Sequence, residues 1–275
     1  MTRTHRGSIP VAASAAIAVA FTGAIQAVVH DHPASAAVAT LASTKSAQIM
    51  QRPLNNNCSG GHVTFTFDDG PRENTEELLD ALDEFGIDAV FFWNGQNVKG
   101  REHTVTRAIA EGHVIGNHTW DHADMTTGEL PDGSKETLDG AWVRSELERT
   151  NEALMAAGAP RPTLYRPPYG AINNQVDGMA QKLGLRLVMP WGYHEDDNIV
   201  DTHDTEGATT EEIIDVTIRW MRDGSIITMH DTHGPATLNS IAALQAIVDA
   251  MNEKSLCATT DVREDATGRV LDVYG

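Results

Sequence analysis

The fold is decided by the stretch 63–71, which reads Val-Thr-Phe-Thr-Phe-Asp-Asp-Gly-Pro. Its first five residues are apolar or β-branched and predict a buried strand. The strand ends on two adjacent carboxylates, Asp68 and Asp69. Adjacent carboxylates are costly unless something binds them, and neighbouring strand residues point in opposite directions, so we expect two different functions. An Asx turn before Gly70-Pro71 is the structural alternative, and both interpretations can hold together.

Working outward from this stretch, short β-type segments alternate with amphipathic segments of helical length. The predicted strands are 63–67, 89–93, 114–115, 163–165, 186–189 and 225–229, and the predicted helices are 75–85, 103–111, 138–157, 175–183, 210–222 and 237–252. Alternation of this kind is typical of a parallel sheet with helices outside it. Six or seven such units in a chain of 275 residues favour an α/β barrel, complete or incomplete, over an open sheet.

Polar residues follow the predicted strands at one end. They are Asp68 and Asp69 after the first strand, His118 after the third, Arg166 after the fourth, His194 to Asp197 after the fifth, and His230 and Asp231 after the sixth. The carboxyl ends of the strands form the active face of parallel α/β folds. The placement therefore predicts an active site at this edge.

The segment His118-Thr-Trp-Asp-His122 is a candidate metal-ligating motif. Two histidines four residues apart can face one point, and two imidazoles with one carboxylate commonly hold catalytic zinc and related ions. This spacing alone often arises by chance. Together with the carboxylates at the end of a buried strand, it predicts a metal site in which one aspartate binds the ion and the other stays free as a base.

The N-terminal forty residues differ from the rest of the chain. Arg3 and Arg6 precede an apolar run at 11–29, and Ala34-Ser-Ala36 has the small-x-small pattern of a signal peptidase site. We interpret residues 1–36 as a cleaved signal peptide, 37–57 as a linker and 58–275 as one folded domain. An uncleaved membrane anchor is the alternative. Both place the domain outside the cytoplasmic membrane, and we expect a secreted, extracellular protein.

The two cysteines of the chain predict a covalent link within the folded domain. Cys58 and Cys257 stand at the two ends of the domain, and in an exported chain they predict one disulfide, which would stabilise the fold by about 4 kcal/mol. Two free buried thiols are the alternative.

The formal net charge is −19, from 20 basic and 39 acidic residues. This charge argues against nucleic acid or an anionic membrane as a partner, because both need a basic face.

Four motifs then occur in order along the chain. They read Thr-Phe-Asp-Asp-Gly-Pro at 66–71, His-Thr-x-x-His at 118–122, Arg-Pro-Pro-Tyr-Gly at 166–170 and Met-His-Asp at 229–231. Across residues 58–257 they resemble the successive motifs of the polysaccharide deacetylase family, the NodB-homology carbohydrate esterases. The resemblance implies a distorted, incomplete (β/α) barrel of about seven parallel strands, and makes 58–275 a catalytic domain. It also implies hydrolysis of acetyl groups on N-acetylglucosamine polymers or on acetylated xylan.

The resemblance further implies a metal site and a base. Asp69, His118 and His122 would bind a divalent metal ion, usually zinc and sometimes cobalt. The ion would polarise the acetyl carbonyl and activate a water molecule. Asp68 would take the proton from that water.

Three other residues receive roles in the same way. His230 would protonate the leaving group, and Arg166 would pair with Asp68 and keep it ionised. A backbone N–H near Tyr169 would stabilise the oxyanion.

One family motif is altered in this sequence. The family often carries an Asp-x-x-Asp-Trp segment after the fifth strand, which we align with the stretch from Trp191 to Asn198. His194 then replaces the first acid, Asn198 replaces the tryptophan, and Asp197 retains the second acid. The resemblance implies that Asp197 tunes the catalytic histidine. Loss of the aromatic wall affects the fit of the substrate rather than the metal chemistry.

Three functions are compatible with these residues. The first is a metal-dependent deacetylase of amino-sugar polymers or oligomers, of the chitin or peptidoglycan type. The second is an O-acetyl xylan esterase with the same residues, and the third is a carbohydrate-binding protein that has lost catalysis. The presence of both Asp68 and His230 argues against the third. We expect an acetylated polysaccharide or oligosaccharide as partner, no nucleic acid and no stable membrane partner after signal cleavage.

Overall fold

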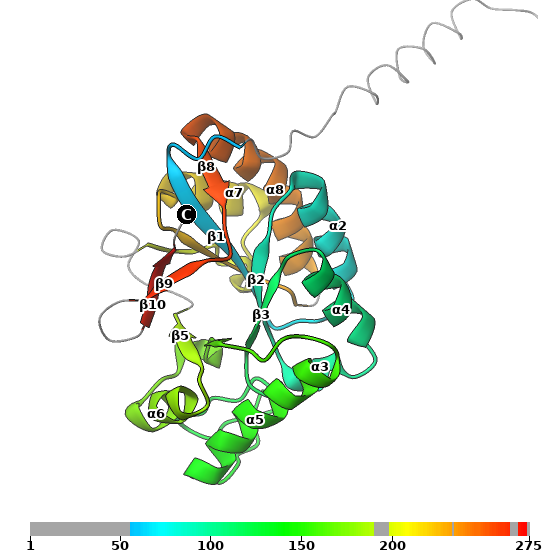
Figure 1. Cartoon of the computed structure of the whole chain (residues 1–275), viewed down its shortest axis with the longest axis vertical. Coiled ribbons are helices and arrows are strands. Elements are labelled where there is room, and N and C mark those ends of the chain that lie inside the picture. The colour runs from blue at the N-terminus through cyan, green and yellow to red at the C-terminus, as the bar shows by residue number, and fades with distance from the viewer. Residues whose placement is uncertain (1–55, 190–197, 233, 265–268, 274–275) are drawn as a thin grey trace, which may run out of the picture. The chain divides into compact units, whose positions relative to one another are not determined.

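The computed structural model describes residues 56–189, 198–232, 234–264 and 269–273 (Figure 1). The segment interpreted as a signal peptide, most of the linker, and both His194 and Asp197 lie outside these residues. Within the described part of the chain, no helix is long and apolar enough to cross a membrane.

Seven parallel strands form one curled sheet in the order β6-β7-β1-β2-β3-β4-β5. Their bounds are β1 Gly61–Asp68, β2 Ala89–Trp93, β3 Val114–Asn117, β4 Leu164–Tyr165, β5 Arg186–Val188, β6 Ile199–Asp201 and β7 Ile226–His230. No pairing joins β5 to β6 among the described residues, so the barrel is not closed there. The incomplete (β/α) barrel predicted from the sequence is confirmed.

Three further strands lie near the C-terminus. Strand β8 (Leu256–Ala258) pairs in parallel with the start of β1. Strand β10 (Arg269–Val273) extends the sheet beyond β5, and β9 (Val262–Glu264) pairs with it in the antiparallel sense. The sequence analysis predicted none of these strands, and it also missed β6. All four lie outside the strand–helix alternation on which the prediction was based, because no predicted helix separates β6 from β5 and none follows residue 252.

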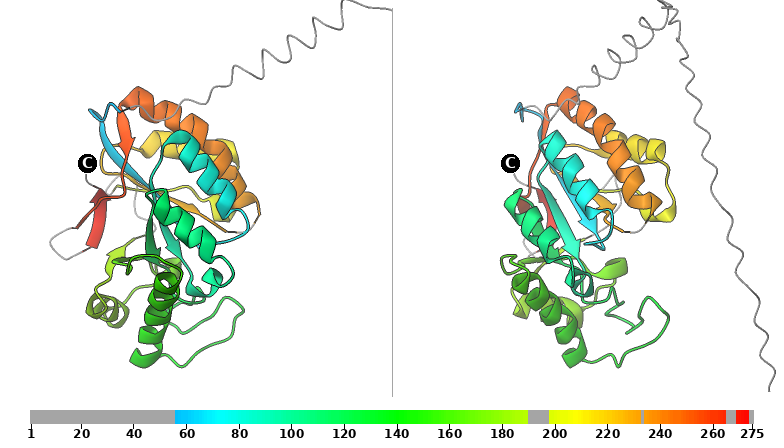
Figure 2. Two further views of the ribbon diagram at one scale, coloured as in Figure 1. Left: turned by 45° about the vertical axis from the view of Figure 1, so that its right-hand side comes forward. Right: turned by 90° about the vertical axis from the view of Figure 1, so that its right-hand side faces the viewer.

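Helices surround the sheet. They are α2 Thr75–Phe85, α3 Gly95–Val98, α4 Glu102–Ala110, α5 Gly140–Ala156, α6 Asn174–Lys182, α7 Thr210–Trp220 and α8 Pro235–Lys254. Helices α2, α4 and α8 lie together on one side of the central strands (Figure 2). Six of these helices confirm predicted ones, with small shifts at the ends. For example, α5 begins at Gly140 because the Asp139 side chain caps it, accepting the Trp142 N–H at 2.8 Å.

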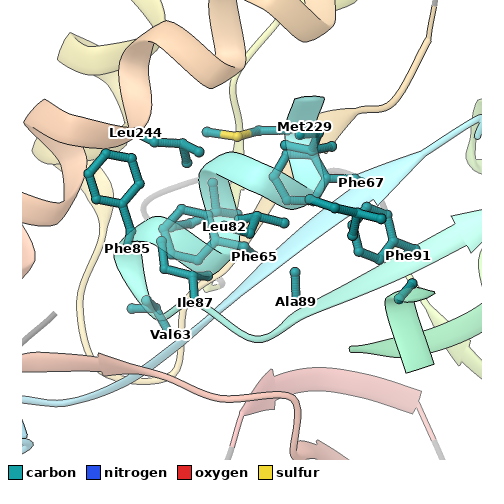
Figure 3. Close-up of a cluster of buried hydrophobic side chains, with 14 of the residues drawn as sticks. Val63, Phe65, Phe67, Leu82, Phe85, Ile87, Ala89, Phe91, Met229 and Leu244 are labelled. Carbon is teal, nitrogen blue, oxygen red and sulfur yellow. The ribbon is translucent and has the colours of Figure 1, made fainter. Parts of the chain in front are cut away.

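The main core lies between the sheet and this helical layer. Alternate residues of β1 (Val63, Phe65 and Phe67) point into the core and are fully buried (Figure 3). They pack with side chains such as Phe91 of β2 and Leu244 of α8. The intervening residues of β1 face the interior of the barrel. This alternation separates the apolar core from the polar groups that build the site.

The two ends of the domain are joined covalently. Cys58 and Cys257 form a disulfide across a sequence separation of 199 residues, which confirms the predicted pair.

Candidate active site

A buried ion pair lies at the carboxyl end of β1. Arg166, directly after β4, donates from Nη1 to an oxygen of Asp68 at 2.8 Å and to the Thr66 hydroxyl at 2.8 Å. Its guanidinium also lies over the Phe92 ring, 4.4 Å from the centroid. Arg166 is fully buried and Asp68 is 2% exposed. The pair orients the Asp68 carboxylate and compensates its charge, as the sequence predicted.

The next carboxylate turns the other way. Asp69 has a φ of 78°, which lifts its side chain out of the strand direction. Its Oδ1 lies 3.3 Å from His118 Nε2 and 3.1 Å from His122 Nε2. Ligand atoms of the three residues all lie within 4.8 Å of one another. The predicted triad is therefore assembled at one point.

The hydrogen bonding of His118 indicates which kind of ligand fits between the three side chains. Its Nδ1 lies 2.6 Å from the carbonyl oxygen of Arg166, and because a carbonyl can only accept, Nδ1 carries the hydrogen. In the neutral ring, Nε2 then presents a lone pair to Asp69. The facing Asp69 Oδ1 is buried and accepts no hydrogen bond from the described residues. A lone pair facing a carboxylate oxygen is repulsive, so the arrangement fits a cation between them.

The charge state of Asp69 agrees with this fit. Burial opposes ionisation of the carboxyl, but positive charge on the side of His118 and His122 outweighs it and holds the pKa of Asp69 well below its usual range. The side chain is thus ready to bind a cation as a carboxylate.

Residues 118–122, called the metal loop below, follow an irregular path after β3. Thr119 and His122 both have a φ of 64°. The N–H groups of Gly95 and Gln96, at the start of α3, donate to the Thr119 and Trp120 carbonyls at 3.0 Å each. Several hydrogen bonds are needed to hold non-glycine residues in the left-handed region, and these supply part of that support.

A histidine–aspartate pair lies at the end of β7. The ring Nδ1 of His230 lies 2.6 Å from Asp204 Oδ1. The other oxygen, Asp204 Oδ2, accepts hydrogen bonds from the backbone N–H of His230 at 2.8 Å and from the Ser240 hydroxyl at 2.9 Å. Burial works against a charge on the ring, but Asp204 outweighs it and raises the pKa of His230 to about 9. At neutral pH, His230 is therefore protonated and can act as an acid.

These groups line one cleft of about 400 Å³, whose wall includes Asp68, Asp69, His118, His122, Pro167, Tyr169, Thr205, Glu206 and His230. Tyr169 follows the Arg-Pro-Pro sequence with a φ of 57°. Its ring is 51% exposed and contacts the His122 ring edge-on, with centroids 4.7 Å apart. Tyr169 also lines a second pocket of about 370 Å³, together with residues between 124 and 133.

Comparison with known proteins identifies the family. A family model described as polysaccharide deacetylase matches residues 55–188. A chitooligosaccharide deacetylase of Rhizobium leguminosarum bv. trifolii is 30% identical over 204 residues, which are 70% of this chain and 86% of the relative. The chain belongs to the polysaccharide deacetylase family.

Other members of the family extend the comparison. A bifunctional xylanase/xylan deacetylase of Cellvibrio japonicus is 37% identical over 202 residues, which are 73% of this chain but only 27% of that larger protein. The structure of a family 4 carbohydrate esterase from Streptomyces lividans, in complex with acetate, superposes with a TM-score of 0.64 at 33% identity. That match covers 78% of this chain and 99% of the esterase.

The partner of His230 differs from the sequence expectation. The alignment assigned this role to Asp197, which lies outside the described residues, whereas the carboxylate bonded to His230 is Asp204. The stretch Asp201-Thr-His-Asp204 has the Asp-x-x-Asp spacing of the family motif. Thr205 follows where the motif has tryptophan, so the aromatic signal is missing. The spacing itself was the signal that could have identified Asp204.

A second buried acid supports the turn that carries Asp69. Asp231 is fully buried and accepts from the Thr75 hydroxyl at 2.8 Å and from Trp93 Nε1 at 3.1 Å. It packs so closely on Gly70 that a Cβ there would lie 2.0 Å from Asp231 Oδ2. Only glycine therefore fits after Asp69. Asp231 links β7, β2 and the start of α2 beneath the metal-binding side of the cleft.

Proposed function

We propose that this member of the family is a metal-dependent deacetylase that hydrolyses N-acetyl groups of amino-sugar polymers or oligomers. The observation that carries the proposal is the convergence of three elements in one cleft: the Asp69–His118–His122 triad, Asp68 paired with Arg166, and His230 paired with Asp204. A divalent cation held by the triad, zinc in our proposal, would act as a Lewis acid on the acetyl carbonyl and the attacking water.

The side chains of the cleft carry out the proton transfers. Asp68, oriented by its ion pair with Arg166, accepts a proton from the water that attacks the acetyl carbonyl. His230 donates a proton to the leaving nitrogen as the carbon–nitrogen bond breaks. An amine is a poor leaving group unless it is protonated, so an acid with a pKa of about 9 suits N-acetyl substrates. After the products leave, Asp68 releases its proton to solvent and the His230 ring takes one up from solvent, while Asp204 stabilises the protonated ring.

The surroundings of the cleft support a substrate longer than one sugar. The second pocket shares the exposed Tyr169 ring with the cleft, which gives a neighbouring sugar an aromatic wall and nearby polar groups such as Asp124 and Glu129. A chitin-type or peptidoglycan-type chain fits this arrangement. Acetylated xylan is the second candidate, because the Cellvibrio relative is named as a xylan deacetylase.

Export from the cytoplasm is part of the same proposal. The apolar N-terminal run and its small-x-small site support it, and so does the Cys58–Cys257 disulfide, because disulfides persist in oxidising compartments.

The experiment is a panel of acetate-release assays on chitooligosaccharides, peptidoglycan and acetylxylan, with Asp68→Asn as the inactive control. We expect release from the amino-sugar substrates and its loss in the variant. Release from acetylxylan alone would favour the esterase. Binding of glycans without any acetate release would contradict catalysis and favour a binding protein.

A further inference from the structure

One buried acid has no part in the chemistry described so far. Glu146 in α5 is 1% exposed. A buried carboxyl group is costly unless hydrogen bonds compensate for the lost water, and such groups are often found near functional sites. Glu146 points from α5 to the middle of the metal loop.

The contacts of Glu146 fall between the two histidine ligands in the sequence. Its Oε2 accepts the Trp120 N–H at 3.0 Å. Its carboxyl group is also within hydrogen-bonding reach of the Asp121 side chain. Asp121 Oδ1 is buried and receives no hydrogen bond from any donor group in the described residues.

We propose that Glu146 is a positioning residue for the metal site, which fixes the path of the metal loop through Trp120 and Asp121. His118 and His122 flank these two residues, so their imidazoles converge only when the loop keeps this path. The inference rests on the proposed function in one respect, because it takes the triad to hold a cation.

The other contacts of the loop show why the α5 side matters. On the α3 side, the loop is held through its carbonyl groups. On the α5 side, the Arg149 guanidinium lies over the Trp120 ring, 4.2 Å from the centroid, and its Nη1 is 3.7 Å from Glu146 Oε1. The Trp120 ring also packs tightly on Gly95, where a Cβ would lie 2.6 Å from it. Glu146 is thus the polar contact that joins α5 to the loop backbone.

The test measures the dissociation constant for zinc by competition with a chelator, in the unaltered protein and in two variants. Glu146→Leu removes the hydrogen bond from the Trp120 N–H and the polar contact with Asp121, and we expect about tenfold weaker zinc binding, as for other residues that orient metal ligands. Glu146→Gln should bind zinc as the unaltered protein does, because its amide can accept from Trp120 and donate to Asp121. The visible spectrum of the cobalt-loaded proteins reports the ligand geometry independently of activity.

Two controls come from the same helix. Glu152→Gln makes the same charge change on the exposed face of α5, and Val143→Ala truncates a buried side chain of the same helix that belongs to an apolar cluster with Leu147 and Tyr165. Both should leave zinc affinity unchanged. If Glu146→Leu does not fold, Asp121→Ala removes the side-chain half of the contact and should also weaken zinc binding.

Unchanged zinc affinity in Glu146→Leu or in Asp121→Ala would overturn the inference. A loss in Glu146→Gln as large as in Glu146→Leu would overturn it as well, because hydrogen bonding would not be the cause. Zinc binding that the variants leave intact contradicts this inference alone, whereas absence of zinc binding in the unaltered protein contradicts the proposed function too.

Discussion

The pair of Asp204 and His230 predicts a specific pH dependence. The distance of 2.6 Å and the burial of Asp204 make the protonated ring the favoured form. The difference between the ordinary histidine value of 6.5 and a pKa of about 9 corresponds to about 3 kcal/mol of preference for that form. Asp204→Asn removes the negative charge while keeping the shape of the side chain. The pKa of His230 should then fall toward its ordinary value.

The expected effect on activity depends on pH. At pH 8, a histidine with a pKa of about 9 is about 90% protonated, whereas one with the ordinary value is about 3% protonated. If His230 acts as the acid, kcat/KM for acetate release should therefore fall about thirtyfold at pH 8 and less than about twofold at pH 6. The alkaline limb of the pH profile should move down from near 9. The assay is acetate release from a chitooligosaccharide between pH 5 and pH 10.

The stabilisation of the fold by this charge pair should also decrease as the pH rises. Because the folded-state pKa of His230 is raised, the charge pair contributes its full stabilisation below pH 6.5, and this is lost as the pH rises through about 9. Asp204→Asn should thus lower the melting temperature more at pH 6 than at pH 10. The matched control is Ser240→Ala, which removes one donor to Asp204 and keeps the carboxylate. An alkaline limb that stays in place in Asp204→Asn, or an equal loss of activity at every pH, would refute the reasoning.

Three further predictions concern the base, the disulfide and the second pocket. Arg166→Met should abolish acetate release and lower the free energy of unfolding by about 3–5 kcal/mol in chemical denaturation, because Asp68 is left buried without its partner; full activity in this variant would contradict the role of the pair. Cys58→Ser should lower the unfolding free energy by about 4 kcal/mol, and insensitivity of the unaltered protein to reductant in thermal melts would count against it. Glu129→Gln should raise KM about threefold for long oligosaccharides and leave the shortest substrate unaffected, with Glu136→Gln as a control in the same loop; equal effects of both variants would exclude a sugar contact at Glu129.

The parts of the fold that the sequence predicted are those with long or repeated signals. The run of apolar and β-branched residues at 63–67 identified a strand, and in the structure the alternation of Val63, Phe65 and Phe67 toward the core places Asp68 in the barrel interior. The helices were predicted equally well from their amphipathic patterns. Strand β6 was missed because no predicted helix separates it from β5, so it falls outside the strand–helix alternation.

The site residues also divide into those marked by a short sequence motif and those placed by the packing of distant segments. The ordered motifs identified the triad, the base, Arg166 and His230, because each lies within a short and specific pattern. Asp204, which pairs with His230, was not predicted, because Thr205 removes the tryptophan that marks its motif and β6, which carries Asp201, was not recognised. Glu146 has no motif of its own. Its contact with Trp120 depends on how α5 packs, which no local pattern encodes.

The most direct test of the central claim is a metal titration of activity. The protein is first stripped by a chelator and then reloaded with zinc while acetate release and bound metal are measured together. We expect activity to vanish on removal and to return in proportion to one zinc ion per chain, and His122→Ala should bind and hydrolyse far less under the same conditions. Full acetate release from the metal-free protein, or unchanged zinc binding and activity in His122→Ala, would contradict the assignment of the Asp69–His118–His122 triad as the catalytic metal site.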